Sequence, residues 1–184
     1  MKKLIIGLTG SISSGKGTVV EHLEKKYGAS GYTFSTMLKD ALKRFHLEIN
    51  RDNLIKMSEI IRETFGEDTM AKTMGKDVES DAHEIIVVDG VRRMADIEYL
   101  KKIDGFVLVK LEAKSETRYK RMITRGEKAD DNSKTYDEFL ADAKRSTEVS
   151  IDEVKQYAQE SLDNNGSFEE LYAQVDTLVA KYAN

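Results

Sequence analysis

The stretch LIIGLTGSISSGKGT, residues 4–18, decides the fold. Its first part, Leu4–Thr9, is apolar without alternation and is too short for a buried helix. Such a run is typical of a strand covered on both faces, as in a parallel sheet flanked by helices. A glycine-rich turn follows, and Thr18–Tyr27 then has the pattern of an amphipathic helix. The order strand, turn, helix predicts an α/β layer fold.

The turn fits the pattern G-x-x-x-x-G-K from Gly10 to Lys16. Glycines let backbone N–H groups turn inward around phosphate oxygens, the helix N-terminus adds partial positive charge, and lysine reaches the outer phosphates. The alternative is a Gly/Ser-rich turn with a solvated lysine, which the strand before it and the helix after it disfavour. We therefore expect a phosphate-binding loop that contains Gly10, Ser13, Ser14, Gly15, Lys16, Gly17 and Thr18.

Strand-like and helix-like segments alternate along the rest of the chain. Apolar runs predict strands over 85–88 and 106–111, with a weaker one over 31–35. A fifth strand cannot be identified from the pattern, but the fold we expect would place it near 159–163. Helices are expected over 18–27, 36–45, 53–65, 94–102, 115–125, 136–147 and 167–182. A length of 184 residues suits one domain, so we predict a three-layer P-loop fold with a five-stranded parallel sheet and helices on both faces.

The composition limits the partners. The chain has 29 Lys and Arg against 33 Asp and Glu, a net charge of -4 whose field repels nucleic acid and anionic membranes. It contains no cysteine, which excludes disulfides, thiolate nucleophiles and zinc–thiolate sites. Its apolar runs are far shorter than the roughly 20 residues of a membrane helix, and the first residues lack a signal-peptide cleavage pattern. We expect a cytoplasmic protein whose partners are small molecules, neither nucleic acid nor membrane.

An aspartate follows the strand predicted over 85–88. Because the carboxyl ends of parallel strands meet at one edge of the sheet, Asp89 should stand near the phosphate loop. A carboxylate there can order the water shell of a magnesium ion beside a triphosphate. Asp89-Gly90 is also a common turn dipeptide, but its combination with Lys16 favours the metal-side interpretation.

The spelling G-K-G-T at residues 15–18 resembles adenylate kinase and its nucleoside monophosphate kinase relatives, although Ser13 stands where they usually have glycine. We expect the loop there to be tighter, or its flanking backbone less strained. Asp89-Gly-Val-Arg92 is similar to the Asp-Gly-Phe-Pro-Arg stretch of these kinases, and residues 125–132 (RGEKADDN) look like the lid of UMP/CMP kinases. Over nearly the whole chain, including Asn164–Ser167, the sequence resembles archaeal adenylate-kinase-related and dephospho-CoA-kinase-like proteins.

The resemblance implies ATP- and Mg²⁺-dependent transfer of the γ-phosphoryl group to a nucleoside monophosphate by a monomer or homodimer. Lys16 would hold donor phosphates, with Thr18 and Asp89 on the metal side. Acceptor-binding helices would span about 36–82 and a lid about 126–135. The residues expected on the acceptor are Thr36, Lys39, Arg62, Arg92 and Arg145. Arg121 and Arg125 would stabilise the transferred group from the lid, which should close only when both substrates are bound.

Two alternatives stay open. A dephospho-CoA-kinase-like enzyme would phosphorylate a ribose hydroxyl, which needs a general base, and Asp40 or Asp89 could serve. A nucleotide-sensing switch would bind ATP and regulate a partner without an acceptor. A panel of acceptors distinguishes these alternatives from a monophosphate kinase.

Overall fold

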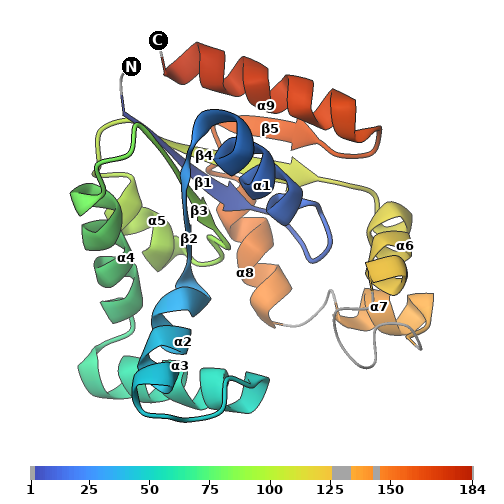
Figure 1. Ribbon diagram of the computed structural model, residues 1–184. Helices are drawn as coiled ribbons and strands as arrows, with labels where there is room; N and C mark the ends of the chain where they lie inside the picture. Colours follow the sequence, from blue (N-terminus) through green and yellow to red (C-terminus); the bar gives the residue numbers. More distant parts are fainter. Residues whose placement is uncertain (1–2, 126–133, 143–145, 184) are drawn as a thin grey trace.

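The computed structural model describes residues 3–125, 134–142 and 146–183 (Figure 1). Within these ranges the chain forms a five-stranded sheet in the order β2-β3-β1-β4-β5, and every neighbouring pair is parallel. The strands are β1 (Leu4–Thr9), β2 (Ser30–Thr33), β3 (Ile85–Asp89), β4 (Phe106–Glu112) and β5 (Glu160–Asp163). The predicted parallel sheet of five strands is confirmed.

Helices connect the strands and cover the sheet. They are α1 (Lys16–Tyr27), α2 (Phe34–Arg44), α3 (Arg51–Phe65), α4 (Thr69–Ser80), α5 (Met94–Leu100), α6 (Ser115–Arg125), α7 (Tyr136–Asp142), α8 (Ser146–Lys155) and α9 (Phe168–Tyr182). In the described part of the chain no helix is both long and apolar enough to cross a membrane.

The expected elements differ from the observed ones most clearly in the second strand, around residues 136–147 and at α4. The weak strand over 31–35 ends at Thr33, because Phe34 already begins α2. Of the single helix expected over 136–147, α7 covers Tyr136–Asp142, residues 143–145 lie outside the described residues, and α8 extends from Ser146 to Lys155 beyond the expected end. The helix α4 was missing from the expected set, since its sequence contains Gly75 and no side chain caps its N-terminus. Tertiary packing stabilises α4 where its helix propensity is weak, because Met74 and Val78 are buried against the sheet.

Helices cover both faces of the sheet (Figure 1). An apolar cluster lies on each face. On one face Leu4, Ile6 and Leu8 of β1 pack with residues of α1 and α9. On the other face Ile5 packs with residues of α4, α5 and α8. Both sets of β1 side chains are buried, which explains why this strand is apolar without alternation.

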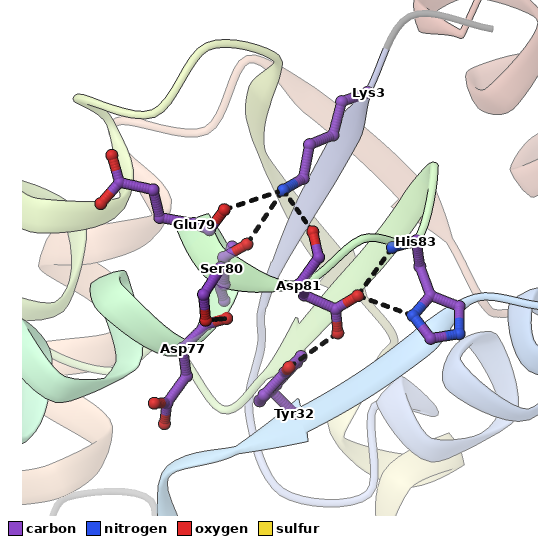
Figure 2. Close-up of polar contacts among 8 residues, drawn as sticks. Lys3, Tyr32, Asp77, Glu79, Ser80, Asp81 and His83 are labelled. Atoms are coloured by element: carbon purple, nitrogen blue, oxygen red, sulfur yellow. Dashed lines mark hydrogen bonds and ion pairs between the residues drawn. The ribbon is translucent and has the colours of Figure 1, made fainter.

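A polar cluster ties α4 to the amino-terminal edge of the sheet (Figure 2). Lys3 Nζ donates to three carbonyl oxygens at the end of α4, those of Val78 (3.1 Å), Glu79 (3.3 Å) and Asp81 (2.7 Å). The Asp81 carboxylate accepts from the Tyr32 hydroxyl at 2.7 Å and from the His83 backbone N–H at 2.7 Å. The lysine therefore caps carbonyls that the helix leaves unpaired, and the aspartate joins β2 to the α4–β3 turn.

Candidate active site

The loop between β1 and α1 has a backbone that glycine permits. Gly10 and Gly15 adopt φ values of 155° and 103°. A Cβ at Gly10 would lie 2.8 Å from the Leu111 carbonyl oxygen, and one at Gly15 would overlap Asn164 Nδ2. Ser13 also lies in the left-handed region, at φ 59°, a conformation that glycine adopts more readily. The loop thus keeps a glycine-like turn at Ser13 without the glycine. The expectation of a tighter loop or a less strained flanking backbone stays a prediction.

Lys16 closes over this loop. Its Nζ donates to the carbonyl oxygens of Gly10 at 2.7 Å and Ser11 at 3.2 Å. Helix α1 begins at Lys16 without a side-chain N-cap and without an acidic residue in its first turn. The helix therefore directs N–H groups and partial positive charge at the loop, as an anion site requires.

Buried polar atoms without a partner gather around the loop. Within the described part of the chain, the buried side-chain atoms that lack a hydrogen bond are Thr9 Oγ1, Ser13 Oγ, Ser14 Oγ, Asp89 Oδ1 and Arg121 Nη1. They come from the ends of β1 and β3, from the loop and from α6. Leaving such an atom unsatisfied costs about 1–3 kcal/mol, more for a charged group. Their number and place indicate a site that is built for a ligand with both acceptor oxygens and positive charge.

Asp89 lies where the sequence placed it, at the carboxyl end of β3. In the sheet register it is opposite Leu8 of β1 and Thr33 of β2. Thr18 is in the first turn of α1 and half-exposed. Among the described residues no group of three or more His, Cys, Asp or Glu side chains could hold a metal. A magnesium ion would therefore take further ligands from phosphate and water, and the unpartnered Asp89 oxygen fits that arrangement.

Arg121 of α6 reaches the far side of the loop. Its Nη2 donates to Asn164 Oδ1 at 3.2 Å, and Asn164 Nδ2 donates to the Ser14 carbonyl at 2.8 Å. Burial lowers the pKa of Arg121. Arg125 is the last residue of α6, whereas Arg145 and residues 126–133 of the predicted lid lie outside the described residues.

Sequence reasoning missed three side chains at the loop. Arg118 Nη1 donates to the Ile12 carbonyl at 3.3 Å, and Lys155 Nζ donates to Ser11 Oγ at 3.2 Å. Asn164 was noted only as part of a family-like motif. For Asn164 the signal was available, because it directly follows a strand predicted to end at this edge. For Lys155 there was no signal, since α8 was not predicted.

A cavity of about 320 Å³ opens beside the loop. It is lined by Ser11, Leu111, Glu112, Ala113, Lys114, Arg118, Lys155 and Asn165. Three of these side chains are basic and one is acidic, so this flank of the loop is positive in a chain of net charge -4.

On the acceptor side Arg62 lies near charges of both signs, those of Arg93, Glu67 and Asp96. Arg93 Nη1 forms an ion pair with Glu67 at 3.5 Å. Burial and the nearby charge of Arg93 lower the pKa of Arg62, which is half-buried on α3. Asp96 fixes the turn that carries Arg93, since its Oδ2 accepts the backbone N–H groups of Arg92 and Arg93 at 3.0 Å each. Burial raises the pKa of Asp96. The Arg92 side chain, which the sequence favoured for this role, is exposed, as is that of Arg93.

The α2 residues of the predicted site are on the surface. Thr36 and Lys39 are exposed, as is Asp40, the alternative base. Thr33 Oγ1 lies 2.9 Å from both Ser35 Oγ and Thr36 Oγ1, so a cluster of hydroxyls marks the start of α2. Of the expected acceptor residues, Arg62 is the one with a half-buried side chain in the described part of the chain.

Comparison with known proteins agrees with this architecture. A family described as an AAA domain (AAA_18) matches residues 6–147. The chain belongs to this AAA domain family. A UPF0200 protein of Hyperthermus butylicus is 27% identical over 179 residues, covering 97% of this chain and 95% of the relative. A UPF0200 protein of Methanocaldococcus jannaschii is 27% identical over 183 residues, covering 98% and 91%.

Solved structures with a similar fold include named kinases. A shikimate kinase from Acinetobacter baumannii has a TM-score of 0.59 at 17% identity and covers 97% of this chain and 94% of its own. A gluconokinase from Sinorhizobium meliloti has a TM-score of 0.61 at 14% identity, with coverages of 98% and 93%. At these identities the likeness establishes the fold of this AAA domain family member, which is that of P-loop kinases.

Proposed function

We propose that the chain transfers the γ-phosphoryl group of Mg²⁺-ATP to a phosphate-bearing acceptor of the nucleoside monophosphate class. The observation that carries the donor half is the set of buried, unpartnered polar atoms around residues 9–14, Asp89 and Arg121. A triphosphate offers oxygens to the serine hydroxyls and to Arg121. Its magnesium ion offers positive charge to Asp89.

The chemistry requires positioning and charge neutralisation rather than a covalent nucleophile. Lys16 would exchange its contacts with the Gly10 and Ser11 carbonyls for phosphate oxygens. Thr18 and Asp89 would hold the magnesium ion, which neutralises charge on the outer phosphates when bound. Arg121 would bring positive charge from the opposite side of the loop.

The acceptor class follows from the balance of charges across the crevice. Arg62 is half-buried near Arg93, and an acceptor phosphate could bind both guanidinium groups, with Glu67 giving up its 3.5 Å ion pair with Arg93. A hydroxyl acceptor would instead need a general base. In the described residues Asp89 is the carboxylate with a buried, unpartnered oxygen, and the metal ion would use that oxygen. These two points favour a phosphate over a hydroxyl as the accepting group.

A panel of acceptors tests the proposal. ATP consumption is measured with AMP, CMP, UMP, their deoxy forms and dephospho-CoA, and with shikimate and gluconate because the structural neighbours are named for them. We expect stimulation by one or more monophosphates. Stimulation by dephospho-CoA, shikimate or gluconate alone would favour a hydroxyl acceptor. ATP binding without stimulation by any acceptor would favour the regulatory switch.

Variants at two lysines of α1 show whether the measured turnover belongs to this site. Lys16→Ala removes the loop lysine and should abolish the stimulated turnover. Lys25→Ala is the matched control, because Lys25 lies on the same helix and pairs with Glu21 on the surface. Stimulated turnover in Lys16→Ala above a tenth of the wild-type rate would contradict the assignment of the donor site.

A further inference from the structure

Asn164 is a polar side chain enclosed between two parts of the candidate site. It follows β5 directly and is 2% exposed. Its backbone N–H donates to the Glu112 carbonyl at 2.8 Å, which continues the β4–β5 pairing. Gln174 of α9 holds the residue before it, since Gln174 makes hydrogen bonds to both the N–H and the carbonyl of Asp163 at 2.9 Å. Strand pairing and α9 thus fix the place from which the amide extends.

The two ends of the Asn164 amide bind different elements. Nδ2 donates to the Ser14 carbonyl oxygen at 2.8 Å, and Oδ1 accepts from Arg121 Nη2 at 3.2 Å. The opposite amide orientation would set an acceptor against the carbonyl and a donor against the guanidinium, so the contacts define one orientation. An amide is suited to this place because it offers a donor and an acceptor at once without adding charge.

The contact with Ser14 orients the phosphate loop. In a planar trans peptide the C=O and the following N–H point in opposite directions. The Ser14 carbonyl points to Asn164, so the Gly15 N–H points away from it. The amide also packs where a side chain at Gly15 would stand. Asn164 therefore sets the direction of one N–H group of the loop and occupies the space that the glycine leaves.

The contact with Arg121 places a positive charge without neutralising it. The amide is neutral, and Nη1 of the same guanidinium is buried without a partner among the described residues. Burial alone accounts for the lowered pKa of Arg121, with no carboxylate contributing. A guanidinium held in this way keeps its charge for an anion that arrives from outside.

We propose that Asn164 is a positioning residue that fixes the phosphate loop and Arg121 relative to each other, so that both engage the same phosphate chain. The expected effect on kcat rests on the proposed function. The expected effect on nucleotide affinity rests only on nucleotide binding by the loop. We expect this position to require an uncharged side chain with both a donor and an acceptor.

The test compares three variants in nucleotide binding and in turnover. Asn164→Ala removes both contacts, and Asn164→Asp keeps size and the arginine contact but sets an oxygen against the Ser14 carbonyl and neutralises Arg121. Gln174→Ala is the matched control, because it weakens the same strand end without touching the loop or Arg121. Thermal unfolding of each variant shows whether it is folded.

We expect both Asn164 variants to weaken binding of the fluorescent analogue mant-ATP about 5- to 10-fold, the size of one lost hydrogen bond. We expect kcat to fall about 100-fold, because misplacement of a charged group by about 1 Å has that effect. The acceptor KM should change less than 3-fold, and Gln174→Ala should leave mant-ATP affinity and kcat near the wild-type values. Wild-type affinity and kcat in both Asn164 variants would overturn the proposal.

A double-mutant cycle separates positioning from plain stability. If Asn164 acts through Arg121, the kcat loss of Asn164→Ala combined with Arg121→Ala should be smaller than the product of the two single losses. Independent losses would contradict the coupling. If Asn164→Ala fails to fold, the isosteric Asn164→Asp decides by the same measurements. If the wild type binds mant-ATP but phosphorylates no acceptor, the proposed function fails while mant-ATP affinity still decides the role of Asn164.

Discussion

The donor and acceptor sides of the crevice differ in how the fold supports them. On the donor side β1 is buried along its whole length, and Val19 and Leu23 anchor α1 with 0% exposure. On the acceptor side no described side chain of α3 is buried, and Ile60 and Phe65 are 56% and 71% exposed. In Figure 1 the α2–α3 pair extends beyond the sheet.

This difference separates a site that is formed in advance from one that a ligand completes. A loop held by the core and by Asn164 can direct its N–H groups before ATP arrives, which reduces the entropy lost on binding. Helices with few buried apolar contacts belong to the low-stability end of a structure, where ligand-dependent movement is found. We therefore expect mutations on the donor side to affect kcat and those on the acceptor side to affect KM.

Lys16→Ala should have the largest effect, because it removes the loop lysine while sparing the core. Stabilisation of phosphoryl charge of this kind is worth about 10³–10⁵ in rate, so turnover should fall by several orders of magnitude. The melting temperature should stay near that of the wild type. Steady-state kinetics and thermal unfolding check both points, with Lys25→Ala as control. More than a tenth of wild-type activity would contradict the assignment of the donor site.

Asp89→Asn tests the metal side of the same region. The change keeps the shape and removes the charge that a magnesium ion would meet, so turnover at a fixed Mg²⁺ concentration should fall about 100-fold or more. Binding of mant-ATP without Mg²⁺ should be unchanged. Titration of activity with Mg²⁺ measures the effect. Asp40→Asn is the control on exposed α2, and a large loss in that variant instead would support the alternative with a hydroxyl acceptor.

Variants at three arginines test the acceptor side. Loss of one charge-assisted hydrogen bond costs about 1.5–3 kcal/mol, so Arg62→Ala and Arg93→Ala should raise the acceptor KM about 10- to 100-fold. The affinity for mant-ATP should stay constant. Arg92→Ala should have a smaller effect, because the charge of Arg93, rather than that of Arg92, acts on Arg62. The reverse ranking of Arg92→Ala and Arg93→Ala would restore the assignment that the sequence favoured.

The donor side could largely be predicted from the sequence, because its signals are local. The spacing from Gly10 to Lys16 and the strand that precedes it are contiguous, and Asp89 follows from the rule that parallel strands end at one edge. The contacts that complete the site join residues far apart in the chain. Asn164 lies 150 residues from Ser14, and no periodicity encodes that approach.

The acceptor side was predicted less well for a related reason. Asp96 fixes the turn that carries Arg92 and Arg93 by accepting both backbone N–H groups, and this local geometry was invisible in the spacing. The helix α4 was missed because packing of Met74 and Val78 on the sheet, rather than helix propensity, holds it. Where tertiary contacts decide the structure, a single sequence gives little warning.

Two aspartates hold helices of the donor and acceptor sides in place, and their contributions to the free energy of unfolding can be compared by changing the pH. Asp176 of α9 supports the donor side from behind, where it accepts from His22 at 2.8 Å, Lys26 at 2.6 Å and Tyr27 at 2.8 Å, all on α1. Burial alone would raise its pKa, but these hydrogen bonds outweigh burial and lower the pKa of Asp176 to about 2. At the amino-terminal edge of the sheet, where Asp81 holds the end of the acceptor-side helix α4, hydrogen bonds from His83 and Tyr32 likewise outweigh burial and lower the pKa of Asp81.

Acid should therefore remove the small stabilisation that each of these two carboxylates gives to the folded state. A carboxyl whose pKa is lower in the folded state stabilises the fold above its unfolded pKa, about 3.9. That stabilisation is lost as the pH falls through the folded value. For Asp176, which is 31% exposed, the contribution after solvent screening is about 1 kcal/mol. Asp176→Asn should lower the free energy of unfolding by about that amount at pH 7, and the difference should vanish between pH 4 and 2. Urea unfolding at pH 7, 4 and 3 measures it, and a difference that does not change with pH would mean that packing, rather than charge, connects α1 to α9.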